Sequence, residues 1–342
     1  MTMQNEPMYS VFDTAQLINL LRDNRMLILN SQEFIDKSGS PILFYEHLLE
    51  LSKIGNFEKF SKDICVLESV DTFKSIRTYD GAPYPAFMLL EREIYLYSKF
   101  GKINIEILRN DIFGNIIDYK LDVTRNNDMF LYNKLHSEVM KDALSSVLPS
   151  AIRNPNFRKK LSTLEKNNVI LYPATNSFLC DSITNFMQNR LKNKSEIDNF
   201  LPLFKSFQDD KKRDAKSALD LAKENFGQNI DLNQTYEDLF YNQLFEGFKD
   251  LAIRHYEIKT DALKEVRYDN LILNKIFFYC LKYYANEYNR DKCRKIESSD
   301  IHDIYFLCCS VIFKVFVDKR TFPLGKQISK ELGIKLNIEK NI

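Results

Sequence analysis

Three aspartates near the C-terminus have the residue type and the spacing of a divalent-cation site. Asp300 and Asp303 open a predicted helix in the segment Ser-Ser-Asp-Ile-His-Asp, and Asp318 directly follows the apolar stretch Val-Phe-Val. Residues three positions apart lie on one face of a helix, so Asp300 and Asp303 point the same way. An aspartate at the carboxyl end of a buried strand lies where α/β sheets collect their functional groups. Because Mg²⁺ and Mn²⁺ prefer carboxylate oxygens, these side chains predict a shared metal site.

Two more acids occur in comparable positions near the N-terminus. Asp13 follows a predicted strand at 9–12, and Glu46 lies in a predicted helix. Glu50 is an alternative to Glu46, because it lies one turn further along the same helix face. Ordinary explanations stay open, since an aspartate before a helix is a common N-cap and the helix dipole favours acids in the first turn. The hypothesis is that five carboxylates converge: Asp13, Glu46, Asp300, Asp303 and Asp318.

Convergence of these acids would suit the hydrolysis of a phosphodiester. A metal ion makes its bound water more acidic and stabilises charge on the phosphoryl oxygens. Carboxylates held together repel one another, so burying them without a cation is costly. Lys319 and Arg320 directly follow Asp318 and are candidate contacts for the phosphate, with ordinary surface charge as the alternative. His47 and His302 adjoin proposed acids, but neighbouring helix positions point about 100° apart, so neither is expected to face the metal.

The segments that must position these acids have mixed strand and helix signals. A helix is predicted over 14–22 from its apolar spacing, and Ser40-Pro41 predicts a helix start that continues to about residue 54. Further predictions are a strand at 63–67, a helix over 85–100, a β-hairpin formed by 102–108 and 116–123, and a mainly helical region over 131–288 with one isolated strand at 169–172.

Strands therefore lie toward both ends of the chain, on either side of a helical block. This order predicts an α/β core in two parts, residues 1–125 and 291–342, with residues 126–290 as a large, mainly helical insertion. The metal ligands would then come from both ends of the sequence.

Composition excludes several other classes. The 48 basic and 47 acidic residues give a net charge of +1, so a nucleic acid would have to be held by a local basic patch rather than by a basic coat. The clusters Arg153–Lys160 and Lys211–Arg213 are candidates, although solvated helix faces explain them equally well. No apolar run is long enough for a membrane span, and the start lacks the features of a signal peptide. The six cysteines show no CxxC spacing. A cytoplasmic protein without a membrane partner is expected.

Taken in order, the motifs resemble those of PIN-like nucleases. They are Asp13-Thr after a strand, Glu46 after Ser-Pro, the helix start Ser-Asp300-x-x-Asp303, and Phe-Val-Asp318-Lys-Arg-Thr. The resemblance covers about residues 8–60 and 296–335. It implies a Rossmann-like α/β/α fold and a metal-dependent ribonuclease, many of which are toxins or defence effectors. Carried over, it implies Mg²⁺ or Mn²⁺ on Asp13, Asp300 and Asp318, with Glu46 and Asp303 completing the site.

Two functions are consistent with these residues. The first is an endoribonuclease that hydrolyses RNA, with the helical insertion available to a controlling protein or nucleic acid. The second is a non-catalytic interaction protein with the same fold, in which the acids serve as helix caps and surface charge. DNA in place of RNA also stays open as the substrate.

Overall fold

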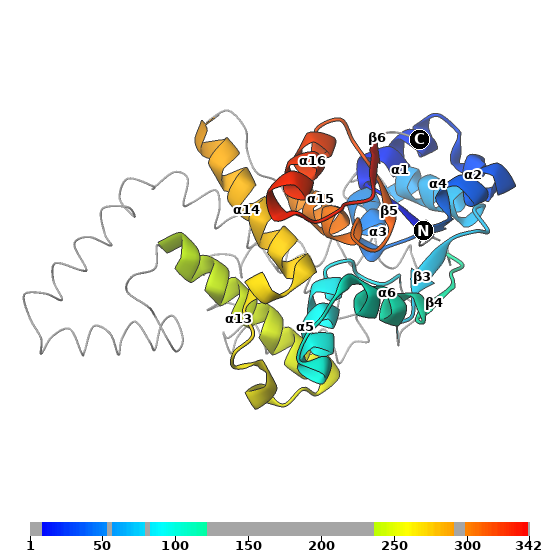
Figure 1. Ribbon diagram of the computed structural model, residues 1–342. Helices are drawn as coiled ribbons and strands as arrows, with labels where there is room; N and C mark the ends of the chain where they lie inside the picture. Colours follow the sequence, from blue (N-terminus) through cyan, green and yellow to red (C-terminus); the bar gives the residue numbers. More distant parts are fainter. Residues whose placement is uncertain (1–8, 53–56, 79–82, 122–235, 291–297, 341–342) are drawn as a thin grey trace, which may run out of the picture.

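The computed structural model describes residues 9–52, 57–78, 83–121, 236–290 and 298–340, and a mixed six-stranded sheet lies at its centre (Figure 1). The strand order is β4-β3-β2-β1-β5-β6, and only the β3–β4 pair is antiparallel. Helices surround this sheet, so the fold is α/β. The strands are β1 (Tyr9–Phe12), β2 (Ser40–Ile42), β3 (Lys74–Ile76), β4 (Ile116–Asp118), β5 (Lys314–Val317) and β6 (Ile338–Lys340).

The two central strands, β1 and β5, are short apolar segments from opposite ends of the chain. Val11 is in register with Val315 and Phe12 with Phe316, and all four are buried. Parallel strands covered on both faces are apolar at successive positions, which explains the sequences Ser-Val-Phe and Lys-Val-Phe-Val. The Phe12 and Phe316 rings stack with their centroids 5.1 Å apart. Tertiary packing therefore pairs two strands that the sequence separates by some three hundred positions.

The strand order reverses direction at β1. From β1 the chain proceeds to β2 and β3 on one side, and it later returns to place β5 and β6 on the other. The carboxyl ends of β1 and β5 therefore flank a topological switch point, where open α/β sheets bind their ligands. Asp13 and Asp318 are the first residues after these two strands.

Side chains alternate between the two faces of the sheet, and each face supports its own apolar core. Phe12 and Phe316 pack into one core with the helices α1 to α4, while Val11 and Val315 pack into the other with the later helices. The first set comprises α1 (Thr14–Arg22), α2 (Gln32–Ser38), α3 (Tyr45–Ser52), α4 (Phe57–Glu68) and the 3-10 segment η1 (Met26–Asn30). The second comprises α5 (Met88–Phe100), α6 (Ile105–Phe113), α13 (Tyr236–Tyr256), α14 (Ile272–Arg290), α15 (Ser298–Cys309) and α16 (Thr321–Leu332), with η2 (Thr260–Leu263) and η3 (Tyr268–Asn270).

Helices α13 and α14, which belong to the predicted insertion 126–290, pack directly on the core helices. Phe277 of α14 has its ring 5.5 Å from that of Phe248 and stacks on Tyr305 of α15 at 5.5 Å. All three rings are fully buried in the same apolar core. Residues 122–235, with the isolated strand predicted at 169–172 and both basic clusters, lie outside the described residues. The described part of the insertion is thus helical and continuous with the core.

Several predicted elements are confirmed. The strand at 9–12, the helix over 14–22, the helix that opens before Asp300 and the strand that ends before Asp318 all occur as expected. The helix predicted over 85–100 is α5, which begins three residues later at Met88. Each of these segments has a strong local apolar pattern.

Three predicted elements are wrong. Ser40-Pro41 belongs to strand β2, whose Ile42 is buried beside β1, and the next helix begins only at Tyr45. The strand predicted at 63–67 lies within α4. The predicted hairpin is a helix followed by one short strand, because the Asn104 side chain caps α6 by accepting the backbone N–H of Ile107 at 2.8 Å. Capping and sheet pairing thus outweighed the turn signals.

Candidate functional site

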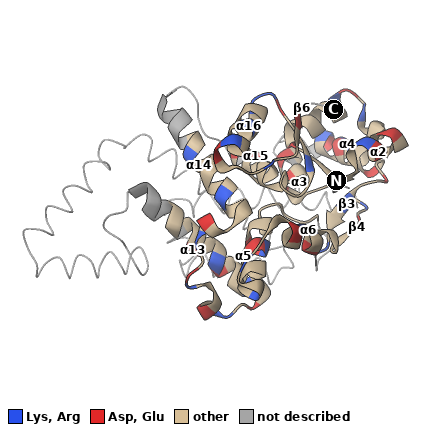
Figure 2. Ribbon diagram, viewed as in Figure 1, with Lys and Arg blue, Asp and Glu red and all other residues tan. Residues whose placement is uncertain are grey.

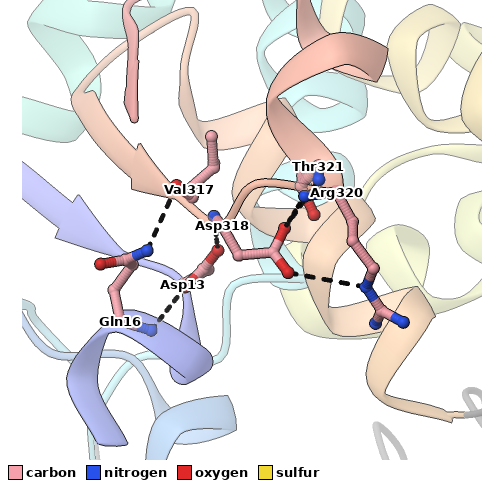
Figure 3. Close-up of polar contacts among 6 residues, drawn as sticks. All are labelled: Asp13, Gln16, Val317, Asp318, Arg320 and Thr321. Carbon is pink, nitrogen blue, oxygen red and sulfur yellow. Dashed lines mark hydrogen bonds and ion pairs between the residues drawn. The ribbon is translucent and has the colours of Figure 1, made fainter. Parts of the chain in front are cut away.

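Asp13 and Asp318 meet where β1 and β5 end. The Asp13 carboxylate accepts the backbone N–H of Asp318 on Oδ2 at 2.5 Å and that of Gln16 on Oδ1 at 2.7 Å (Figure 3). The Asp13 side chain is 1% exposed. The two acids predicted from opposite ends of the sequence therefore lie side by side at the switch point.

Local structure holds Asp13 in place from three directions. Its backbone N–H donates to the carbonyl of Phe316 at 2.8 Å, which extends the β1–β5 ladder by one bond. Its side chain caps α1 through Gln16. The Nε2 atom of His47 lies 2.6 Å from the carbonyl oxygen of Phe12, and its Nδ1 accepts the N–H of Phe44 at 2.9 Å. The buried imidazole of His47 thus connects the start of α3 with the end of β1.

The Asp318 carboxylate turns toward the start of α16. Its Oδ1 accepts the backbone N–H of Arg320 at 2.9 Å and that of Thr321 at 2.7 Å (Figure 3). Its Oδ2 lies 3.6 Å from Nε of Arg320, whose side chain is 71% exposed. Lys319 is also exposed. Of the two predicted phosphate contacts, Arg320 has a direct ion pair with Asp318 and still points its guanidinium toward solvent.

Helix α15 brings two more acids to the same place. Asp300 is buried, whereas Asp303 retains partial exposure. Burial raises the pKa of Asp303 well above its usual range, and the charges of neighbouring carboxylates raise it further. Those neighbours are Asp13, Asp318, Asp300 and Glu50. Four of the five predicted acids thus interact electrostatically around Asp303.

Glu46, the fifth predicted acid, has a different environment. Its carboxylate is fully buried and accepts the backbone N–H groups of Ala86 at 2.8 Å and Phe87 at 3.3 Å, directly before α5. Glu50 is among the charges that raise the pKa of Asp303. One helical turn separates the two glutamates, so the position of α3 decides between them. The structure brings Glu50, the alternative, to Asp303 and directs Glu46 to the start of α5.

The electrostatics of Asp13 are those of a carboxyl removed from water. Burial raises the pKa of Asp13 to about 7, against the lowering effect of its hydrogen bonds with Gln16 and Asp318, and the negative charge of Asp318 adds to the rise. A neighbouring cation has the opposite effect, because it favours the ionised form. The site as it stands is therefore rich in negative charge that a bound cation would stabilise.

The donor atoms suit a hard divalent cation, but they do not form a complete coordination shell. Among the described residues, no group of three or more histidine, cysteine, aspartate or glutamate side chains is arranged to hold a metal ion. Each Asp13 oxygen accepts one N–H group, which leaves further lone pairs for a ligand. Mg²⁺ characteristically keeps several waters and takes one or two carboxylates. The carboxylates of Asp13, Asp300 and Asp318 are of the chemical type that such an ion prefers, but the described residues do not arrange three of them as ligands of one ion.

Little in the residue pattern around His302 indicated that it contributes to the environment of these acids. Its Nδ1 lies 2.6 Å from Oε1 of Glu50, and the ring is 1% exposed. Because neighbouring helix positions point in different directions, the side chain of His302 points away from that of Asp303 and toward α3. Only a prediction of how α15 packs on α3 could have identified this pair.

Comparison of the chain with protein-family models, with curated proteins and with solved structures finds no match. Acidic and basic residues are interspersed along the described helices, for example on α5 (Figure 2). Of the helices that the structure describes, none combines the length and apolarity that crossing a bilayer requires.

Proposed function

We propose that this chain is a metal-dependent endoribonuclease of the PIN-like class, with a Rossmann-like α/β/α core and Mg²⁺ or Mn²⁺ as its cofactor. The observation that carries the proposal is the contact between Asp13 and Asp318 at the ends of two adjacent parallel strands. The strand order, with its switch point between β1 and β5, supports it. The effect of four other acids on Asp303 supports it independently, because stable proteins rarely gather like charges without a compensating ligand.

Each residue has a role in this proposal. Asp13, Asp300 and Asp318 hold the metal, and Asp303 with Glu50 orients the attacking water. The chemistry that the metal supplies is a more acidic water and neutralisation of charge on the phosphoryl oxygens. Arg320, exposed beside Asp318, binds a phosphate of the substrate, and Lys319 adds positive charge next to it. Glu46 stays outside the reaction.

Three parts of the proposal rest on the resemblance to PIN-like nucleases. These are RNA rather than DNA as the substrate, a cytoplasmic role as a toxin or phage-defence effector, and recruitment of a controlling protein or nucleic acid by residues 126–290. The proposal also includes no membrane partner.

The second candidate is a non-catalytic interaction protein, and one observation favours it. Asp13 caps α1 and Asp318 accepts two backbone N–H groups at the start of α16, so both acids already have structural partners. Capping alone, however, does not require Asp300, Asp303 and Glu50 to lie close to these two caps.

The test is cleavage of labelled single-stranded and hairpin RNA by the purified chain with Mn²⁺, alongside DNA of the same sequence. Asp13→Asn and Asp318→Asn are each expected to reduce the cleavage rate by roughly 100-fold or more, because each weakens stabilisation of charge in the transition state. Asp261→Asn is the matched control, since this exposed aspartate forms a surface ion pair with Lys264. Equal cleavage by all four proteins would refute the site. No cleavage of any substrate, together with no binding of Mn²⁺, would favour the interaction protein.

A further inference from the structure

We propose that His302 is a positioning residue, which holds the carboxylate of Glu50 against Asp303 and so makes Glu50 a member of the acidic site. The inference rests on the proposed nuclease function. It adds a residue whose contact is with another side chain rather than with metal or substrate.

The contact joins two helices that carry site acids. The Nδ1 atom of His302 on α15 lies 2.6 Å from Oε1 of Glu50 on α3. The ring is 1% exposed and Glu50 is 15% exposed, so neither side chain can move freely into solvent. Asp303 follows His302 directly in α15, and the charge of Glu50 acts on it. The pair therefore sets how closely Glu50 approaches Asp303.

His302 also lies close to Glu46, the other glutamate on the same face of α3. The charge of His302 lowers the pKa of Glu46, which burial otherwise raises. Glu46 is held by the backbone N–H groups of Ala86 and Phe87, whereas the imidazole of His302 lies against the carboxylate of Glu50. Of the two glutamates, Glu50 is therefore the one in direct contact with His302.

A comparison with His47 distinguishes positioning from simple packing. Both rings of His47 and His302 are buried, and both His47 nitrogens have partners, in Phe44 and Phe12. By contrast, neither ring nitrogen of His302 makes a hydrogen bond in the part of the chain that the structure describes, and the 2.6 Å contact of Nδ1 with Glu50 is an ion pair. Buried polar atoms in a purely structural position are nearly always satisfied. The ring of His302 thus lies beside Glu50 with hydrogen-bonding capacity that packing alone does not explain.

The contact is an ion pair when the ring is protonated. The imidazolium and the neutral tautomer with its hydrogen on Nδ1 both carry a donor on the atom that lies next to Glu50. Groups that orient metal-binding carboxylates typically contribute about 10-fold to 100-fold to metal affinity or activity. Removal of His302 is expected to fall in this range.

The experiment measures Mn²⁺ affinity by calorimetry and RNA cleavage by the full chain for His302→Leu and His302→Gln. The leucine variant is expected to bind Mn²⁺ about 10-fold to 100-fold more weakly and to lower kcat by a similar factor, with KM for RNA unchanged. Glutamine retains a donor and is expected to recover part of both losses. Glu50→Gln alone and together with His302→Leu should give the same affinity, because both changes remove one interaction.

His255→Leu is the matched control, because it removes a second histidine–glutamate contact, in which Nδ1 of the partly buried His255 lies 2.5 Å from Oε2 of the buried Glu91. It is expected to leave Mn²⁺ affinity unchanged. Wild-type affinity in His302→Leu, or additive losses in the double variant, would overturn the inference. If circular dichroism shows that the leucine variant does not fold, the same measurements on His302→Gln and on its double variant with Glu50→Gln test the inference.

The variants also separate failure of this inference from failure of the metal site. If Asp13→Asn and Asp318→Asn lose Mn²⁺ binding but the His302 variants keep it, only the positioning role is refuted. If all of these variants bind Mn²⁺ as wild type does, the metal site itself is refuted.

Discussion

Two regions of the molecule bury acidic side chains, and they do so with opposite electrostatics. At the carboxyl ends of β1 and β5, Asp303 is surrounded by four other carboxylates, and their charges raise its pKa further. At the junction of α5 with α13 and α14, each buried glutamate faces donors or a histidine. Burial of an acid is therefore not in itself a sign of function. The charge of its neighbours distinguishes the two regions.

Glu93 is the clearest example of a structural acid. Its carboxylate accepts the backbone N–H groups of Ile272, Leu273 and Asn274, the first residues of α14, at 2.6 to 3.0 Å. The amide of Asn274 donates to it as well, at 3.0 Å. It thereby caps α14 from a different helix and complements the positive end of the helix dipole.

Glu91, two residues earlier in α5, forms the second structural contact. Its Oε2 lies 2.5 Å from Nδ1 of His255 on α13. Burial raises the pKa of Glu91, and the hydrogen bond and charge of His255 lower it. Burial has the opposite effect on His255 and lowers its pKa. The hydrogen bond and the charge of Glu91 more than offset this effect, so the pKa of His255 lies above its usual value. Each group thus compensates part of the cost of burying the other.

The largest effect that would separate the two regions is a dependence of stability on pH in metal-free buffer. Because the pKa of Asp13 rises from 3.8 to about 7 on folding, the folded state holds a proton that the unfolded state has released between these values. Stability from this group is therefore highest below about pH 4, falls as pH rises to about 7, and is constant above. At about 1.4 kcal/mol per pKa unit, the decrease is roughly 4 kcal/mol.

Urea denaturation of wild type and Asp13→Asn between pH 4 and 8 measures this decrease. The variant loses a hydrogen bond at every pH, so the difference in slope, rather than the offset, reports the titration. Parallel curves for the two proteins would contradict the high pKa. Saturating Mn²⁺ is expected to flatten the wild-type curve, because a cation stabilises the ionised form.

The second effect tests the structural region. Glu93→Gln replaces one acceptor oxygen by an amide nitrogen that cannot accept, so one or two donors at the start of α14 lose their partner, depending on which oxygen is replaced. We expect the free energy of unfolding to fall by roughly 3 kcal/mol, since each unsatisfied buried group costs about 1 to 3 kcal/mol. Glu106→Gln, at an exposed position in the first turn of α6, is the control and should change it by less than about 0.5 kcal/mol. Equal stability of the two variants would place Glu93 outside the cap.

The third effect is an increase in stability rather than a loss. Asp303→Asn removes a carboxyl whose ionised form is disfavoured by burial and by neighbouring acids, so in metal-free buffer at pH 8 we expect it to raise the free energy of unfolding. The same variant should bind Mn²⁺ more weakly. Denaturation at both pH 8 and pH 4 checks the cause, because the gain should shrink when the acids are protonated. A loss of stability at pH 8 would show that Asp303 is a structural acid like Glu93.

The smallest effect is stabilisation by the ion itself. A ligand at ten times its dissociation constant that binds only the folded state stabilises it by about 1.4 kcal/mol. Thermal unfolding with Mn²⁺ is expected to show this gain for wild type and for His255→Leu, and to lose it for Asp318→Asn. An equal shift in all three proteins would indicate that Mn²⁺ binds elsewhere.

Prediction from the sequence succeeded where short-range pattern and structure coincide. The apolar stretches before Asp13 and Asp318 form the two central strands, and the N-cap that Asp13 was expected to provide is present. The prediction failed where long-range pairing outweighed local preference. Ser40-Pro41 has the residues of a helix start, but burial of Ile42 beside β1 gives β2 instead. Asn104, read as part of a hairpin, caps a helix.

The choice between Glu46 and Glu50 shows the limit most clearly. Both lie on one face of α3, so their spacing alone cannot separate them. The turn before α5 presents free N–H groups to Glu46, and α15 presents His302 to Glu50. Neither α5 nor α15 is near α3 in the sequence, so this difference appears only after folding.

The amino-acid sequence alone was enough to identify which aspartates follow buried strands and which begin a helix, because burial and capping depend on residues a few positions away. Tertiary structure alone decided that β5 lies against β1, that the N–H of Asp318 reaches the carboxylate of Asp13, and that Glu50 accompanies Asp303. These contacts join segments up to 305 positions apart. Their formation depends on the packing of two apolar cores against one sheet, which no local pattern encodes.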